Sequence, residues 1–272
     1  MAPSDLGAQL PSTGRDFPDL RVEGGVMPGA RWRLSTRFGG RSEAEFAQAN
    51  MADHVGDYPH AVAANRRSLA ASLSGIRDVA FVKAEHGARV QWVSSGDEVT
   101  VGDALITDTP GLGLAAMGAD CAVLGLSAQR KNGTVVVAVV HCGWRGLVTD
   151  VVGATLQEMR DSGAVSVAAV LGPAICGDCY QVSVDRWEQV QASCSASVAS
   201  CALVRNQEGG NQLWGIDIGA GVLASLAEHD VSVRAEFGCT YEQDQWFSLR
   251  RAVDHWGPQA RTGRHALMVA SL

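Results

Sequence analysis

Residues 134–140, TVVVAVV, form an almost uninterrupted run of apolar β-formers. A strand of this kind is covered on both faces, because a half-exposed strand would alternate apolar and polar residues. The run ends at HCGWRG (141–146), and apolar residues then recur at helical spacing between 148 and 159. The segment therefore predicts a buried strand, a tight loop and a helix.

Other segments continue this alternation of strand and helix. Strands are expected within 31–40, 77–87, 111–126 (two strands), 165–173 and 231–239, and helices within 59–73, 183–191 and 215–231. Asp185 is the expected N-cap of the second of these helices, and Asp217 lies near the start of the third. The strand within 231–239 is expected in the interior of a sheet and not at its edge. The alternation predicts an α+β (mixed α/β) domain with partly parallel sheets.

The charge pattern narrows the class of partner. The chain of 272 residues is 46% hydrophobic and 19% charged, which suits a globular protein with a large core. Its formal net charge of -7 would repel a phosphodiester backbone or an anionic membrane, and its basic residues are scattered. A small molecule is therefore the expected partner, whereas nucleic acid and membranes are not.

Sorting signals and cysteine usage indicate a reducing compartment. Residues 1–20 lack the apolar core of a signal peptide, and no segment approaches the roughly 20 apolar residues that cross a bilayer. We therefore expect a cytoplasmic protein. Seven cysteines are an odd number for a disulfide framework, so free thiols or metal ligands are expected.

The chain shows no internal repeat, heptad pattern or low-complexity linker. Its first residues are rich in Pro, Ser and Gly, which is typical of a mobile chain end. We expect residues 1–25 to form a mobile N-terminal segment and residues 26–272 to form a single catalytic domain.

Four chemically active residues follow predicted strands: His86, Asp120, Cys121 and His141. In open α/β sheets, ligands collect beyond the carboxyl ends of strands. Two imidazoles and one thiolate are good zinc ligands, and three protein ligands leave a fourth position open. Their spacing matches no short zinc motif, so only the fold could bring them together. Hydrogen-bonded loop histidines and a small buried cysteine remain the alternative.

The Gly-Trp-Arg-Gly corner could bind an anion. Gly143 and Gly146 allow a tight backbone turn, and Arg145 can direct two donors at an oxyanion such as phosphate. An ordinary strand-to-helix turn is the alternative, with Trp144 packed as a lid and Arg145 in a surface ion pair.

These residues also resemble a known family. The segment HCGWRG is similar to the His-Ala-Gly-Trp-Arg-Gly signature of the laccase-domain proteins, or multicopper polyphenol oxidase family, usually described as purine nucleoside phosphorylases with adenosine deaminase activity. The other matching segments are STRFGGRS, NMADHVGDYPHAVAANRR, GDALIT, GADC, LGPAICGDCYQV and CTYEQDQWFSLRR, followed by TGR. The resemblance covers roughly residues 30–270, with the motifs in the family's order.

The resemblance implies a fold of four layers, α/β/β/α, with mixed sheets, and a zinc site formed by His86, Cys121 and His141. It implies a zinc-dependent purine nucleoside phosphorylase that acts on adenosine, inosine, guanosine or methylthioadenosine with phosphate, together with adenosine deaminase activity. Copper is a less favoured metal. The assembly state is left open.

Roles for further residues follow from this chemistry. Asp120 is the candidate proton carrier, although it could instead orient a ligand histidine or cap a turn. Arg145 and Arg250 are the candidates for binding phosphate during catalysis. The candidates for substrate binding are Arg37, Asn50, Ser248 and Arg251.

The chain departs from the family pattern at three places. Ala84-Glu85 replaces the usual Gln-Val before the first ligand histidine, which would remove or alter a polar contact. Cys142 stands where alanine is common, which would put a second thiol beside the metal. Leu249 replaces a polar or aromatic residue, so substrate preference could differ from that of typical members.

Other functions remain open at this stage. Some relatives are assigned to peptidoglycan editing, in which an amidohydrolase removes a misincorporated amino acid from a precursor. A metal-free hydrolase would use Cys121 as nucleophile and His141 as base. A copper polyphenol oxidase, with Met117 near the ligands, lacks the further histidines of a multicopper cluster. A binding module without activity is the last alternative.

The remaining cysteines and histidines receive no site role. The segment CGDC (176–179) has the spacing of a redox pair or of half a structural zinc site, but it has no thioredoxin context and no second CxxC follows. Incidental or buried thiols are expected at Cys194, Cys201 and Cys239. Surface or loop positions are expected for His54, His60, His229, His255 and His265.

Overall fold

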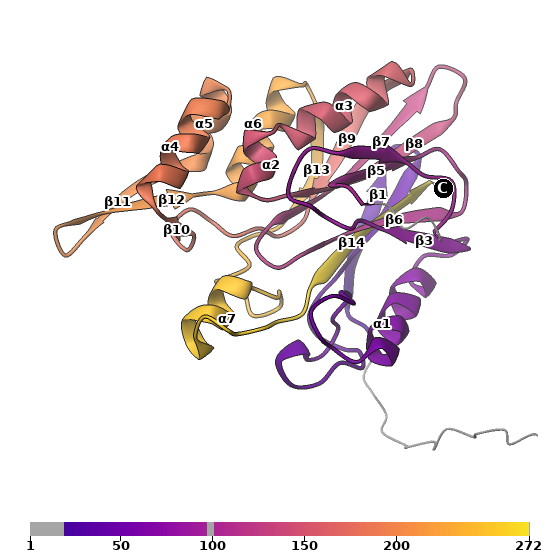
Figure 1. The fold of residues 1–272 in the computed structure, drawn as a ribbon. Coiled ribbons are helices and arrows are strands. Elements are labelled where there is room, and N and C mark those ends of the chain that lie inside the picture. The colour runs from indigo at the N-terminus through magenta and orange to yellow at the C-terminus, as the bar shows by residue number, and fades with distance from the viewer. Residues whose placement is uncertain (1–18, 97–100, 272) are drawn as a thin grey trace, which may run out of the picture.

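Two mixed β-sheets pack face to face in the computed structural model, which describes residues 19–96 and 101–271 (Figure 1). The five-stranded sheet has the order β1 (Val22–Met27), β2 (Ala30–Ser35), β14 (His265–Ser271), β6 (Leu112–Gly118) and β3 (Asp78–Phe81). The six-stranded sheet has the order β13 (Ser232–Glu236), β9 (Ala164–Leu171), β7 (Ala122–Arg130), β8 (Val135–Cys142), β5 (Ala104–Thr107) and β4 (Val90–Trp92). The pairs β3/β6, β4/β5 and β9/β13 are parallel and the other pairs in these sheets are antiparallel, so both sheets are mixed.

The apolar run of β8 is buried on both faces, as its sequence predicts. Val136, Ala138 and Val140 pack into the core beneath the helices, whereas Val137 and Val139 pack into the core between the two sheets. Because successive side chains of a strand point to opposite faces, only a strand covered on both sides has this composition.

Helices cover the outer face of each sheet. Helix α1 (Pro59–Ala71) packs Leu69 against the five-stranded sheet. Helices α3 (Val151–Asp161) and α6 (Ile218–Glu228) pack Leu156, Met159 and Val222 against the six-stranded sheet (Figure 1). The order of layers is α/β/β/α, which confirms the expected fold class.

A smaller unit extends from one side of the sheets (Figure 1). It contains a three-stranded sheet in which β12 lies between β10 and β11. Its hairpin was not predicted from the sequence, and the tip of this hairpin is Gly209-Gly210 with both φ values positive. The elements of this region are β10 (Gln181–Val182), α4 (Val184–Ser193), α5 (Ala196–Ala202), β11 (Leu203–Glu208) and β12 (Asn211–Ile216).

Two predictions about helix starts are corrected by the structure. The helix expected after the corner is two helices, α2 (Trp144–Val148) and α3, because Asp150 adopts a left-handed conformation and its carboxylate caps Gly153 N–H. Ser183, rather than Asp185, occupies the N-cap position of α4, and Asp185 lies in its first turn. Asp217 is the N-cap of α6, as expected.

The edges of the sheets also differ from expectation. Strand β13 was expected inside a sheet but lies at an edge, whereas β14, which was not predicted, lies inside the five-stranded sheet. Strand β1 begins at Val22, so ordered structure begins before residue 26. The rest of the expected mobile segment, residues 1–18, lies outside the described residues.

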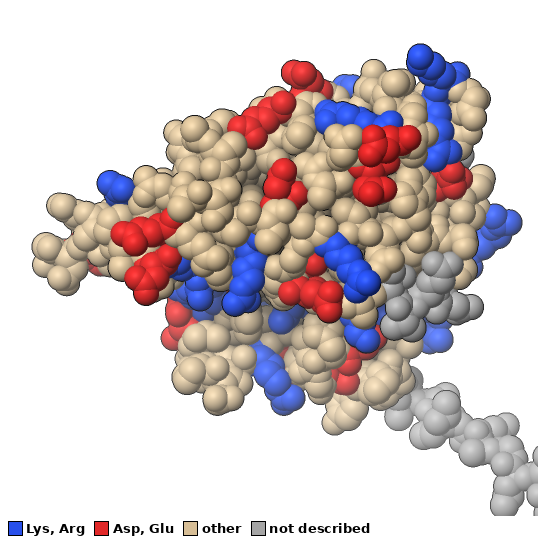
Figure 2. Space-filling model, turned by 45° about the horizontal axis from the view of Figure 1, so that its top comes forward, with Lys and Arg blue, Asp and Glu red and all other residues tan. Residues whose placement is uncertain are grey.

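None of the helices in the described ranges combines the length and hydropathy needed to cross a bilayer. Acidic and basic side chains are interspersed over the face drawn in Figure 2.

His265 is fully buried in β14, contrary to the expectation of a surface or loop position. Its ring packs against Trp246, and neither ring nitrogen has a hydrogen-bond partner in the protein. Burial and the neighbouring Arg264 guanidinium lower the pKa of His265 from its ordinary value of 6.5 to about 3. The folded protein therefore keeps this ring neutral.

This pKa predicts a loss of stability in mild acid. Between about pH 6.5 and pH 3 the unfolded chain binds a proton at His265 and the folded chain does not, so the free energy of unfolding falls as pH falls through this window. The contribution is at most about 1.4 kcal/mol per pH unit. Urea unfolding at pH 7, 6 and 5 should show a shallower pH dependence for His265→Phe than for the parent. Exposed His255→Phe should retain the parent's slope, and equal slopes for all three proteins would refute the assignment.

Candidate metal centre

Three side chains that are distant in the sequence lie together at one end of the two sheets. One ligand atom from each of His86, Cys121 and His141 lies within 4.8 Å of the others. The two imidazole rings are nearly perpendicular, with centroids 4.8 Å apart. The loops from β3 to β4 and from β6 to β7 supply His86 and Cys121, and strand β8 supplies His141. The fold thus gathers the predicted ligands.

The close approach of Cys121 depends on Gly143 in the corner after β8. A Cβ atom at residue 143 would lie 2.8 Å from Cys121 Sγ and 3.6 Å from His86 Cδ2. The antiparallel pairing of Ala122 with Cys142 places Cys121 directly opposite this corner. A side chain at residue 143 would displace the sulfur, so the glycine is required here for space and not for a positive φ.

Asp103, which was not among the predicted site residues, holds two of the three ligands in place. Its fully buried carboxylate accepts hydrogen bonds from the backbone N–H groups of Glu85, His86 and Gly87, at 3.1, 2.7 and 2.9 Å. Its backbone carbonyl accepts from His141 N–H at 2.7 Å. These bonds stabilise the left-handed conformation of His86, whose φ is 62°. The motif Gly102-Asp103-Ala104 could have identified Asp103 from the sequence.

Asp103 also lies near the imidazole of His141. Its Oδ1 is 3.8 Å from His141 Nδ1, a buried nitrogen that has no hydrogen-bond partner. Burial alone would raise the pKa of Asp103, but His141 and the N–H groups of Gly87 and His86 outweigh it and lower that pKa. The carboxyl group is therefore ionised, and it resembles the carboxylates that accompany metal-ligating histidines.

The electrostatics of Cys121 and His141 favour a thiolate. Burial alone would raise the pKa of Cys121, but His141 and His86 outweigh it and lower the pKa to about 6. Burial alone would lower the pKa of His141, but Cys121 and Asp103 raise it to about 9. A thiolate is the form of cysteine that binds metals.

The donor set fits a transition metal. One thiolate and two imidazoles converge, and the ionised Asp103 carboxylate lies 3.8 Å from Nδ1 of His141. Three protein ligands leave room for a further ligand, because His86 is exposed and Cys121 is partly exposed. The arrangement can therefore hold an ion that also contacts a substrate.

Asp120 lies beside Cys121 but uses both carboxylate oxygens in hydrogen bonds. Oδ1 accepts from Thr240 Oγ1 and Oδ2 accepts from Arg250 N–H, each at 2.7 Å. Its φ of 98° is unusual for a residue other than glycine. Asp120 thus ties the metal loop to the start of α7 (Leu249–Trp256). Proton transfer by Asp120 stays a prediction.

Three guanidinium groups alternate with two aromatic rings near the corner. Arg145 and Arg186 lie over the ring of Trp144, with distances of 4.9 and 4.8 Å to its centroid. Arg186 Nη1 also donates to the Tyr180 hydroxyl at 3.4 Å, and Arg250 lies over the Tyr180 ring at 5.2 Å. The structure thus connects Arg145 and Arg250, the two predicted phosphate ligands, through Arg186. No motif or spacing in the sequence indicated Arg186.

Two other predicted residues organise the loop before α7. Ser248 is the buried N-cap of α7, and its Oγ accepts from Arg251 N–H. The Arg251 guanidinium donates to the carbonyls of Thr240, Tyr241, Gln243 and Trp246. Both side chains support the loop, and contact between them and a substrate stays a prediction.

Arg37 and Asn50 also bond to the backbone. Arg37 donates to the Ala47 carbonyl and lies over the Phe247 ring at 5.3 Å. The fully buried Asn50 side chain donates to the Ala52 carbonyl and accepts from Arg264 N–H. A role for Arg37 and Asn50 in substrate binding stays a prediction.

The residues that depart from the family pattern take different positions. Contrary to the expectation of a second thiol beside the metal, Cys142 is fully buried in the core beneath the helices, on the opposite face of β8 from His141, so its thiol is directed away from the three ligands. Burial raises the pKa of Cys142, which therefore stays a neutral thiol. Glu85 and Leu249 are exposed.

Comparison with known proteins agrees with this architecture. A family model described as multi-copper polyphenol oxidoreductase laccase matches residues 31–271. A purine nucleoside phosphorylase of Mycobacterium tuberculosis is 36% identical over 253 residues, covering 90% of this chain and 94% of the relative. One from Streptomyces coelicolor is 37% identical over 237 residues, covering 83% and 92%. The crystal structure of YlmD from Geobacillus stearothermophilus superposes with a TM-score of 0.76 at 27% identity, covering 93% and 99%. The chain belongs to the multi-copper polyphenol oxidoreductase laccase family.

Proposed function

We propose that the protein is a zinc-dependent purine nucleoside phosphorylase with a companion adenosine deaminase activity. The observation that carries the proposal is the convergence of His86, Cys121 and His141 on one ligand position. Trp144, over whose ring Arg145 and Arg186 lie, follows Gly143, the glycine that lies against Cys121. The relatives named purine nucleoside phosphorylase support the substrate class, a purine nucleoside with phosphate.

Zinc fits the donor set better than copper. One thiolate and two imidazoles that leave an open position form a donor set suited to catalytic zinc. Met117, the methionine that a blue-copper site would require, instead packs near α1, with its sulfur 3.8 Å from Arg66 Nη2. Within the described ranges, the other cluster of potential ligands contains no histidine that could extend the centre. When bound, zinc supplies a Lewis acid with one face open to substrate.

The protein's own residues supply the remaining parts of the chemistry. Arg145 and Arg250 bind the phosphate oxygens, because guanidinium groups form paired, charge-assisted hydrogen bonds with such oxygens. Arg186 lies between these two groups and supports the same anion. The Asp120 carboxylate accepts a hydrogen bond from the backbone N–H group of Arg250 and so sets the position of Arg250. Exact placement matters, because oriented binding lowers the barrier to attack at the ribose.

The first prediction concerns activity. Purified zinc-loaded protein incubated with adenosine and phosphate should produce adenine and ribose 1-phosphate, with inosine as a second product. Cys121→Ala should lower phosphorolysis by at least about 100-fold, because it removes a metal ligand. Cys201→Ala, at an exposed position of α5, should retain full activity. Chromatography of the products after defined times measures each outcome.

Other results of this assay would favour other functions. Activity that resists a chelator but is abolished by thiol alkylation would support a Cys121 nucleophile with His141 as base. Release of an amino acid from a peptidoglycan precursor, without turnover of any nucleoside, would support an editing amidohydrolase. Phenol oxidation that requires copper would support the oxidase implied by the family's description.

The second prediction concerns the fit around the ion. Gly143→Ala should weaken zinc binding by about tenfold or more, because the added methyl group would displace Cys121 Sγ. Gly219→Ala in α6 should leave zinc binding unchanged, because the added methyl group would lie 3.5 Å from Asp217 Oδ1, an ordinary van der Waals distance. Competition with a chromogenic chelator gives both affinities, and equal affinities would show that residue 143 does not constrain the ligand.

The third prediction separates positioning from proton transfer at Asp120. Asn can accept from Arg250 N–H and donate to Thr240 Oγ1, but it cannot transfer a proton as a carboxyl group does. If Asp120 positions the loops, Asp120→Asn should keep most of kcat and Asp120→Ala should lose about tenfold or more. If Asp120 carries the proton, Asp120→Asn and Asp120→Ala should lose activity alike, because neither side chain can transfer a proton as a carboxyl group does.

A further inference from the structure

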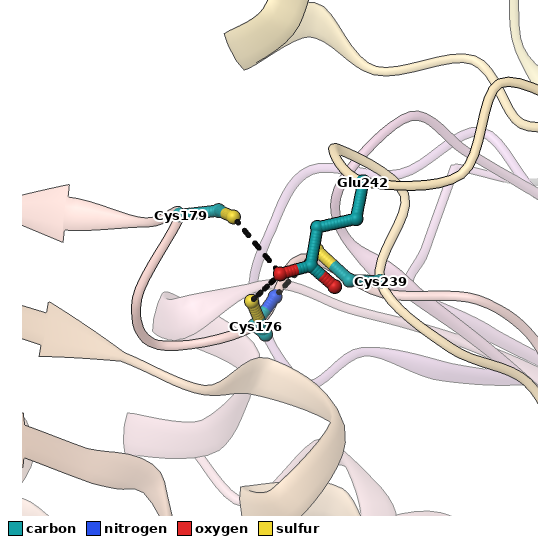
Figure 3. Close-up of side chains that lie close together, drawn as sticks. All are labelled: Cys176, Cys179, Cys239 and Glu242. Atoms are coloured by element: carbon teal, nitrogen blue, oxygen red, sulfur yellow. Dashed lines mark hydrogen bonds between the residues drawn. The ribbon is translucent and has the colours of Figure 1, made fainter.

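A second cluster of metal-ligand side chains lies outside the site described above. It contains Cys176, Cys179, Cys239 and Glu242, whose ligand atoms all lie within 4.8 Å of one another (Figure 3). The first two cysteines come from the loop between β9 and β10, and the other two residues come from the loop between β13 and α7. The CxxC segment, which has no second CxxC in the sequence, is therefore completed by a different loop.

The spacing of these atoms suits a tetrahedral ion. The thiols of Cys176 and Cys179 both donate to Glu242 Oε1, at 3.9 and 3.8 Å (Figure 3). Two ligands of a tetrahedral zinc ion, a thiolate and a carboxylate oxygen, are about 3.6 Å apart, and two thiolates are about 3.8 Å apart. The observed separations therefore require shifts of about 1 Å or less, which side-chain rotation can supply.

Backbone contacts hold the two loops together at this point. Cys176 N–H donates to Cys239 Sγ at 3.3 Å, an arrangement that stabilises a sulfur ligand. Ala174 forms an isolated parallel bridge with Cys239, and Thr240 N–H donates to the Ala174 carbonyl. The cluster is therefore preformed by the backbone and does not arise from chance contacts between flexible side chains.

The turn inside the CxxC segment is also fixed by packing. A Cβ at Gly177 would lie 2.3 Å from Val204 Cγ2, so this glycine allows the turn to lie directly against the β11/β12 hairpin. Tyr180 N–H donates to the Cys176 carbonyl at 2.9 Å across the turn. This turn directs both cysteine side chains toward Glu242 (Figure 3).

We propose that Cys176, Cys179, Cys239 and Glu242 bind a second zinc ion in a closed structural site. Three sulfur ligands select zinc over magnesium or calcium, which prefer oxygen. Four protein ligands complete the coordination shell, so this ion has no position for substrate. All three cysteines are free thiols and are available as ligands. Cys239 was expected to be a buried or incidental thiol; it is buried, and under this proposal it also serves as a ligand.

The proposed ion would stabilise one side of the first site. Thr240, next to Cys239, donates to Asp120, and Ile175, next to Cys176, donates its N–H to the Asp120 carbonyl at 2.9 Å. Asp120 in turn precedes Cys121. The second ion would therefore hold Asp120 and Cys121 in position without contacting the substrate. The proposal of a second ion does not depend on which reaction the protein catalyses.

Metal analysis of the full-length protein tests this proposal. Protein purified with zinc under reducing conditions should contain two zinc ions per chain, and Cys121→Ala should contain one. Adding Cys179→Ser to Cys121→Ala should remove the remaining ion, whereas adding Cys201→Ser, outside both clusters, should not. Glu242→Gln changes an exposed residue with little risk to folding, and in the Cys121→Ala background it should weaken zinc binding by about tenfold or more.

Cobalt titration in the Cys121→Ala background identifies the ligands directly. Cobalt should give strong sulfur-to-metal charge-transfer absorption, since three thiolates remain, and Cys179→Ser should reduce it. The proposal is overturned if Cys121→Ala protein holds no zinc and shows no such absorption. It is also overturned if thiol titration finds Cys176 and Cys179 joined as a disulfide under the same reducing conditions.

Discussion

The buried carboxylate of Asp103 connects segments that carry two of the three ligands. It accepts three backbone N–H groups from the turn that contains His86, while its own carbonyl pairs with the strand that carries His141. Hydrogen bonds from several amides to a buried carboxylate are strong, and losing one partner would leave charge uncompensated. The position of His86 relative to His141, and with it the candidate metal centre, therefore depends on this one residue, through its carboxylate and its backbone carbonyl.

The packing of the two sheets explains why the metal loops meet at one end of the molecule. Strand β6 belongs to one sheet and β7 to the other, so Cys121 lies on the turn that passes between them. Gly125 allows the sheets to approach closely, because a Cβ there would lie 2.5 Å from Val269 Cγ2. Asp120, on the same turn, is bonded to both loops of the second cluster. The two proposed sites are thus linked through one short connection, in which Cys121 is a ligand of the first and Asp120 is bonded to both loops of the second.

Local patterns predicted much of this arrangement, and long-range contacts account for most of what they missed. The apolar run of β8 predicted a strand buried on both faces, and the motifs identified His86, Cys121 and His141. The contacts of Asp103 with the His86 turn, and of Arg186 with Trp144 and Tyr180, however, join residues whose spacing in the sequence matches no motif. Strand β14 was missed although residues 266–270 are all apolar, whereas the burial of His265 within this strand is set by tertiary packing. Cys239 is separated by 60 residues from Cys179, and only the fold shows that they share a cluster.

Anomalous X-ray scattering tests the central claim most directly. Crystals of the protein grown with zinc should show an anomalous peak at the zinc edge about 2.3 Å from Cys121 Sγ and about 2.0–2.1 Å from one nitrogen of each of His86 and His141. An absence of anomalous density between these three side chains, in crystals that bind zinc elsewhere, would contradict the account.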